Sequence, residues 1–349
     1  GDNDGEYLPN DVAKIAFLFL TRGPLPFEKL WRRFLLGDES GQRWSIYVHA
    51  TPGHRYKKSS MFFHRQIRNP VQVEWGEPSM VTAEKLLLRE ALADPLNERF
   101  VLVSEADIPV RPFDCVYDVL FETPKSFMQI GSTNDRWSPR MTKDVPPEGR
   151  VPLRAWRKGS QWFAMTRPHA ELMMSDRNTF KTFKKLCRGK SQDYLPCISD
   201  EHYPATLMAM NKKEQGFHKR SLTYTQWVEG FMSPETISVN PKSRIVEIQK
   251  CHIRGGRKVY VGQGLGGDRE PKDDCGDNGV TIFDGLGNPE RPPVRERPCF
   301  MFARKFPAEV AGKLMGFSHH IVGYPKFQGN LSSALPPLVP AAGRRREDE

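Results

Sequence analysis

The first third of the chain alternates short apolar runs with amphipathic segments, and no other feature limits the possible folds as strongly. Four runs have the length and composition of buried strands, at residues 14–20, 44–49, 71–75 and 99–104. Between them, residues 27–36 and 81–92 place apolar side chains at helical spacing. Alternation of strands and helices predicts a mostly parallel sheet covered by helices, with ligands bound at the carboxyl ends of the strands.

The same reading divides the chain into a single large domain with loose ends. Residues 1–12 are polar and predict a flexible N-terminal segment, and residues 331–349 predict a disordered tail. Residues 13–330 form the domain, within which residues 254–298 are rich in Gly, Asp and Pro and predict an irregular insertion. The sequence contains no internal repeat, so we do not expect a solenoid.

Charge and hydropathy speak against two classes of protein, nucleic-acid-binding and membrane-spanning. The net charge is +10, from 52 basic and 42 acidic residues, but the charges are interspersed and no zinc-finger spacing accompanies them. We therefore expect no nucleic-acid partner. The apolar run at residues 15–20 is far shorter than the roughly 20 residues of a membrane span, so we expect membrane attachment only through an anchor upstream of Gly1.

The six cysteines are compatible with disulfides. The pairs Cys187 with Cys197 and Cys275 with Cys299 each bracket a polar loop that a bridge would restrict. Reduced, packed thiols are the alternative. Asn330 begins a glycosylation sequon, which is compatible with the secretory route.

Two acidic motifs are candidates for chemistry. Glu105 and Asp107 follow an apolar run, where a carboxylate pair can hold Mg²⁺ or Mn²⁺, although acids at strand ends are also ordinary polar residues. Asp200 is an expected N-cap of a helix, which places Glu201 in the first turn. There Glu201 either acts as a general base or only complements the helix dipole.

Two basic segments are further candidates. Arg304 and Lys305 follow an apolar run and either neutralise a leaving diphosphate or form a solvated charge pair. Arg157, Lys158 and Trp162 combine cations with an aromatic ring, as sugar sites do, but also suit an ordinary turn into a strand. The glycine-rich residues 262–267 lack the spacing of a dinucleotide fingerprint and predict a loop.

Taken in order, these segments resemble the core-2/I-branching β-1,6-N-acetylglucosaminyltransferase family, most closely its plant and green-algal branch. The resemblance runs from about residue 14 to about residue 317 and rests on blocks that share the family order. These are AFLFLTRGPLP (16–26), SIYVH (45–49), VEWG (73–76), NERFVLVSE (97–105), WRKGSQWF (156–163), DEHY (200–203) and FARKF (302–306).

The resemblance implies a GT-A-like three-layer α/β/α sandwich with a mixed, mostly parallel central sheet. It implies an inverting transfer from a UDP-sugar donor to a glycan or glycoprotein acceptor, in the Golgi lumen, by the ectodomain of a type II membrane protein. It also implies site residues. Glu201 is the catalytic base; the donor site contains Thr21, Arg22, His49, Trp75, Glu105, Arg304 and Lys305; and the acceptor site contains Arg157, Lys158, Trp162 and Trp227.

The family likeness leaves several questions open. Animal members work without a metal cofactor, but Glu105 and Asp107 keep Mn²⁺ as an alternative. Ala50 stands where animal members carry an Asp that contacts uridine. The donor sugar is expected to be GlcNAc, with xylosyl or glucuronosyl transfer as alternatives within the family. A non-catalytic glycan-binding domain is the alternative outside enzymes, and the joint presence of Glu201 and Lys305 speaks against it.

Overall fold

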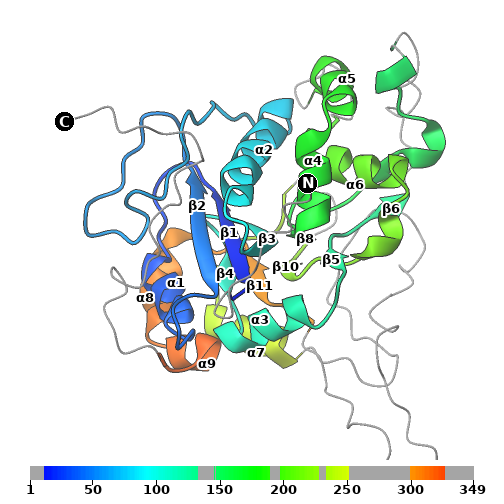
Figure 1. Cartoon of the computed structure of the whole chain (residues 1–349). Coiled ribbons are helices and arrows are strands. Elements are labelled where there is room, and N and C mark those ends of the chain that lie inside the picture. The colour runs from blue at the N-terminus through cyan, green and yellow to red at the C-terminus, as the bar shows by residue number, and fades with distance from the viewer. Residues whose placement is uncertain are drawn as a thin grey trace, which may run out of the picture.

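The computed structural model describes residues 12–132, 145, 147–188, 197–227, 233–250 and 299–326 (Figure 1). The predicted flexible start, apart from Val12, lies outside this range, as do the predicted insertion at 254–298 and tail at 331–349. The sequon at Asn330, the glycine-rich residues 262–267 and Cys275 also fall outside it. The division into one domain with an insertion stays a prediction.

The main sheet has the strand order β2-β1-β3-β8-β5-β9. β1 pairs in parallel with both β2 and β3, β8 runs antiparallel between β3 and β5, and β5 and β9 are parallel. The sheet is therefore mixed and mostly parallel, as predicted. Its strands are β1 (Lys14–Leu20), β2 (Trp44–His49), β3 (Asn97–Ser104), β5 (Ser126–Phe127), β8 (Ala164–Thr166) and β9 (Phe217–His218).

The central strand β1 is buried on both faces, which explains why its sequence is a continuous apolar run. Successive side chains point to opposite sides of a sheet. Phe17 and Phe19 accordingly join one apolar core, whereas Ala16 and Leu18 join the other. Two cores on the two faces of one sheet make a three-layer α/β/α arrangement.

Helices cover both faces (Figure 1). Helix α1 (Glu28–Leu35) buries Leu30, Trp31 and Phe34 in the first core, where the Trp31 ring packs edge-on against Phe19. Helix α2 (Pro78–Leu92) buries Val81, Leu87 and Leu88 in the second core and packs against α4 and α6. Three further helices contribute to the second core together with α2: α4 (Arg167–Ser175), α5 (Asn178–Leu186) and α6 (Ser199–Met210). The other α-helices in the described ranges are α3 (Phe113–Phe121), α7 (Pro241–Lys250), α8 (Ala311–Met315) and α9 (Ser318–Val322).

Two small sheets complete the architecture. β11 (Phe302–Arg304) lies between β10 (Thr223–Thr225), to which it is parallel, and β4 (Ile108–Pro109), to which it is antiparallel. β6 (Gly131–Ser132) pairs with β7 (Arg157–Lys158). Among the helices in the described ranges, none has the length and apolar character that a membrane span needs.

The structure corrects two local predictions. Residues 71–75, predicted as a strand, are irregular, and their side chains instead line a cavity described below. Asp200 is not the N-cap of α6: Ile198 holds that position, and Asp200 is the second residue of the helix. Glu201 still lies in the first turn, as predicted.

Candidate active site

A cavity of about 800 Å³ opens where the strands of the main sheet end. Thr21 and Arg22 follow β1, His49 ends β2, and Ser104 and Glu105 lie at the end of β3, and all of them line the cavity. The carboxyl ends of parallel strands meet at one edge of a sheet, which is where α/β folds bind ligands.

Most of the predicted site residues meet in this cavity, although the sequence spreads them over almost three hundred positions. Those that line it are Thr21, Arg22, His49, Trp75, Glu105, Lys158, Trp162, Glu201, Trp227, Arg304 and Lys305. Arg157 and Asp107 are not among the lining residues.

Glu201 stands in the first turn of α6 with its side chain 23% exposed, and its Oε2 lies 3.3 Å from Lys158 Nζ. Backbone contacts keep Lys158 in place. Its neighbour Gly159 donates its backbone N–H to the Glu201 carbonyl at 2.8 Å. Lys158 and Glu201 both line the cavity, and their side chains form an ion pair.

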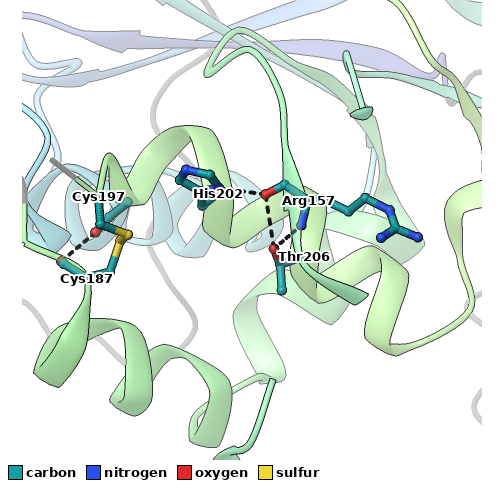
Figure 2. Close-up of a disulfide and its surroundings, with 6 residues drawn as sticks. Arg157, Cys187, Cys197, His202 and Thr206 are labelled. Carbon is teal, nitrogen blue, oxygen red and sulfur yellow. Dashed lines mark hydrogen bonds between the residues drawn. A yellow bond between two sulfur atoms is a disulfide. The ribbon is translucent and has the colours of Figure 1, made fainter. Parts of the chain in front are cut away.

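Figure 2 shows how β7 is attached to α6 on the other side of Lys158. The Arg157 backbone N–H donates to Thr206 Oγ1 at 3.1 Å, and His202 Nδ1 donates to the Arg157 carbonyl at 2.7 Å (Figure 2). The Arg157 side chain points elsewhere, with Nε 2.8 Å and Nη2 3.1 Å from the two carboxylate oxygens of Glu214. Arg157 thus contributes its backbone to the site, whereas the prediction gave it an acceptor contact.

A disulfide secures the start of the same helix. Cys187, directly after α5, is bonded to Cys197, two residues before α6 begins, which confirms the predicted pair (Figure 2). Ser199 Oγ also donates to the Cys187 carbonyl at 3.1 Å. Cys299 forms a disulfide as well, and its predicted partner Cys275 lies outside the described residues.

The two cations at the end of β11 face the cavity from another side. Arg304 lies with its guanidinium carbon 4.0 Å from the ring centroid of Trp162, and its Nε is 3.6 Å from Asp107 Oδ2. Trp162 is only 7% exposed. The Trp162 ring therefore contacts Arg304, which was predicted for the donor site, whereas the prediction placed Trp162 in the acceptor site.

Asp107 is completely buried, and its Oδ2 accepts hydrogen bonds from both the backbone N–H and the hydroxyl of Ser104. Burial raises the pKa of Asp107 to about 6, against the opposing effect of the Arg304 charge. Only Glu105 of the predicted acidic pair lines the cavity, so the two carboxylates do not converge on one point there. The described residues contain no group of three Asp, Glu, His or Cys side chains placed to hold a metal ion.

His49 and Trp75, both predicted for the donor site, line the cavity wall. His49 Nε2 accepts a hydrogen bond from the Val71 backbone N–H at 3.1 Å, which places the ring proton on Nδ1. Burial lowers the pKa of His49 to about 4, so the imidazole is neutral at physiological pH. Trp75 is 52% exposed, a large fraction for an indole, and presents a free aromatic surface at the cavity.

Several lining residues escaped prediction, among them Gln129, Gln161, Asp200 and Thr225. Gln161 lies inside a segment whose hydrogen-bonding side chains suit a sugar site by composition, but the prediction named only Arg157, Lys158 and Trp162 from it. Asp200 was assigned only to capping. It is buried, and burial together with the charge of Glu201 raises the pKa of Asp200 to about 7.

The fold and the cavity define an α/β protein with a ligand-sized cavity at the carboxyl edge of its parallel strands. The chain belongs to the Core-2/I-Branching enzyme family, whose sequence model matches residues 15–252. It is 34% identical over 338 residues to "Glycosyltransferase BC10" of Oryza sativa subsp. japonica, a match that covers 89% of this chain and 78% of the relative. The protein is accordingly a glycosyltransferase, which takes a sugar donor and a glycan acceptor. Glu201 lies inside the range matched by the family, and Arg304 and Lys305 lie beyond it.

Proposed function

We propose that the protein transfers GlcNAc from UDP-GlcNAc to a hydroxyl of a glycan or glycoprotein, with inversion at the anomeric carbon. The observation that carries this proposal is the placement of Glu201 in the same cavity as Arg304 and Lys305. A carboxylate base and a pair of cations are the two groups that such a displacement requires, one on each side of the transferred sugar.

Glu201 is the proposed general base. Its carboxylate accepts the proton of the acceptor hydroxyl, whose oxygen forms the new bond to the anomeric carbon while the bond to the UDP oxygen breaks. General-base catalysis typically contributes about 10²–10⁴ in rate. Lys158 Nζ lies 3.3 Å from Glu201 Oε2 and forms an ion pair with the proposed base.

Arg304 and Lys305 are the proposed diphosphate ligands. Negative charge develops on the UDP oxygen as the glycosidic bond breaks, and cations fixed in advance stabilise it without reorganisation. The stacking of Arg304 on Trp162 supports this role because it holds the guanidinium in one plane. Thr21, Arg22, His49, Trp75 and Glu105 line the remainder of the proposed donor site.

We also propose that Trp227 belongs to the acceptor side of the cavity and that the reaction needs no metal ion. Asp107 is buried behind the cavity wall, where it is hydrogen-bonded to Ser104 and lies beside Arg304, and this supports the second point because it leaves Glu105 without the carboxylate partner of the Mn²⁺ alternative. A Golgi-lumen location under a type II anchor is part of the proposal, and the Cys187–Cys197 disulfide supports an oxidising compartment.

The experiment is UDP release by the purified protein with UDP-GlcNAc, UDP-xylose and UDP-glucuronic acid, each measured with EDTA and with added Mn²⁺. Release from UDP-GlcNAc that survives EDTA supports the proposal in full. Release from either of the other donors keeps the mechanism and replaces the sugar. Loss of release in EDTA contradicts the metal-free mechanism, and no release from any donor contradicts transfer from these UDP-sugars.

A further inference from the structure

One carboxyl group of the second core has no explanation in the proposed mechanism. Glu84 lies on α2 between Val81 and Leu87, its side chain is completely buried, and the helix face around it is apolar. Burial raises the pKa of Glu84 well above its usual range, with the charge of Asp200 acting in the same direction. An acid in this position is expensive for the fold, because a buried carboxyl group loses its hydration.

The contacts of Glu84 do not compensate for that loss. Gln161 Nε2 donates to Glu84 Oε1 at 2.9 Å, while Oε2 is buried and has no hydrogen-bond partner among the described residues. An apolar side chain of similar volume would fill the position without an unpaired oxygen, and such replacements of buried polar groups are often neutral or stabilising. Stability therefore gives no reason for an acid here.

The partner of Glu84 gives one. Gln161 lines the cavity and is the one residue that the Glu84 carboxyl contacts by a hydrogen bond within the described ranges. With its Nε2 held by Glu84, the amide keeps its carbonyl oxygen and its second N–H hydrogen for other partners. Glu84 thus fixes the rotation of a side chain that would otherwise turn freely at the cavity wall.

The position of Gln161 shows which partner it can reach. Three residues before it, Lys158 pairs with the catalytic base Glu201. Directly after it, Trp162 carries the diphosphate ligand Arg304. In an in-line displacement the transferred sugar ring lies between the base and the diphosphate, and Gln161 belongs to the short wall segment that joins the residue paired with the base to the ring that carries Arg304.

We propose that Gln161 hydrogen-bonds a hydroxyl or amide group of the donor's sugar ring, and that Glu84 is the positioning residue that orients it. This inference rests on the proposed function, because that function fixes which end of the cavity holds the base and which holds the diphosphate. It adds a determinant of donor-sugar recognition to a site whose other assigned contacts are to the nucleotide and the acceptor.

The test compares binding of intact donor with binding of UDP alone, by calorimetry, for the parent and for Glu84→Met, Glu84→Gln and Gln161→Ala. UDP-GlcNAc, UDP-xylose and UDP-glucuronic acid are the probes. Glu84→Met and Gln161→Ala should lower the affinity for the bound sugar nucleotide by about fivefold to tenfold, as expected for one lost hydrogen bond. The affinity for UDP alone should stay within about twofold of the parent. Glu84→Gln keeps an oxygen that accepts from Gln161 and should stay within about threefold of the parent. The double variant that combines Glu84→Met with Gln161→Ala should bind donor no more weakly than Gln161→Ala alone, because both changes remove the same contact.

Thermal unfolding distinguishes a positioning role of Glu84 from a role in stabilising the fold. Glu84→Met should raise the unfolding midpoint by about 2 °C or more, because it removes an unpaired buried oxygen. Glu90→Met makes the same chemical change at a partly buried position of α2, where the carboxylate pairs with Arg89, and should leave donor binding unchanged.

Three results would overturn the inference. One is unchanged donor affinity in Glu84→Met or, if that variant does not fold, in Gln161→Ala. Another is a lowered midpoint with equal weakening of UDP and donor, which makes Glu84 structural. The third is a parent that binds neither UDP nor any donor, which removes the proposed function as well. If the parent binds donor and the variants bind it with the same affinity, only this inference is contradicted and the proposed function stands.

Discussion

The guanidinium carbon of Arg304 lies 4.0 Å from the centre of the Trp162 ring, so the cation proposed for the diphosphate is held in a plane by an aromatic face. Its Nε is also 3.6 Å from the completely buried Asp107 carboxylate. Burial lowers the pKa of Arg304, and Asp107 opposes that effect. The positive charge is thus kept in a partly enclosed site by a ring on one side and a carboxylate on the other.

Replacing Arg304 by Lys should weaken UDP binding about tenfold, although the charge is kept. A lysine ammonium lacks the planar fork that binds two phosphate oxygens at once, and it stacks less well on an indole. Calorimetry with UDP measures the effect. Arg89→Lys, on the exposed side of α2, is the matched control, and equal UDP affinity in Arg304→Lys and parent would refute the assigned role.

Glu201→Gln should lower turnover by a factor of about 10² or more and leave UDP affinity within about twofold. The amide keeps the shape of the side chain and cannot accept the proton of the acceptor hydroxyl. Rates of UDP release with acceptor present give the measurement, and Glu171→Gln, an exposed acid on α4, is the control. Parental turnover in Glu201→Gln would take Glu201 out of the mechanism.

Removing the disulfide by changing both Cys187 and Cys197 to Ser should lower the free energy of unfolding by about 3 kcal/mol, from the loop entropy that a bridge between residues ten apart removes from the unfolded chain. The bridge holds the start of α6, where Glu201 lies, whereas the proposed donor site is built mainly from residues at strand ends. Turnover should therefore fall more than UDP affinity.

Urea unfolding and UDP binding of that double variant provide the two measurements. Cys115→Ser, at the partly buried free thiol among the described cysteines, is the control. A double variant with parental stability would contradict the estimate.

Asp200→Asn should stabilise the protein increasingly as the pH rises from 4 to 8. Burial raises the pKa of Asp200 to about 7, so between its unfolded value and pH 7 the folded state holds a proton that the unfolded state releases. The parent consequently loses stability as the pH rises through this window, and the uncharged Asn does not. Each unit by which the pKa is raised corresponds to roughly 1.4 kcal/mol.

Urea denaturation of both proteins at pH 4, 5, 6, 7 and 8 measures the difference. Asp118→Asn, at an exposed position of α3, is the matched control. A difference in unfolding free energy that stays constant across these pH values would contradict the assignment.

The sequence predicted those helices and strands whose pattern of apolar residues follows directly from which of their faces are buried. β1 is a continuous apolar run after Lys14 and is buried on both faces, β2 and β3 are apolar over most of their buried length, and α1 carries an apolar stripe of helical spacing. Residues 71–75 misled the prediction because Val71, Val73 and Trp75 are spaced like one face of a strand. In the structure this spacing serves a cavity wall, where no neighbouring strand supplies hydrogen bonds.

Site residues could be predicted where the residue type itself indicates the chemistry. They were missed where the role depends on the position of the side chain in the folded protein. Glu201, Arg304 and Lys305 are recognisable as base and cations, and the cavity brings them together. The direction of the Arg157 side chain depends on Glu214, 57 positions away, which no local pattern records. Glu84 looked like an ordinary polar residue of an amphipathic helix, and only the packed fold reveals that it is buried.

The place of β11 between β10 and β4 has a consequence for the order in which the protein matures. β4 follows β3 early in the chain, but its partner strand is among the last described parts to leave the ribosome, and Arg304 is in that strand. A nascent chain can thus assemble the proposed base and the strand ends of the proposed donor site before the proposed diphosphate ligands have been synthesised. Affinity for UDP should arise only after the C-terminal segment has been synthesised and inserted, so retention on immobilised UDP would report completed folding of newly made molecules.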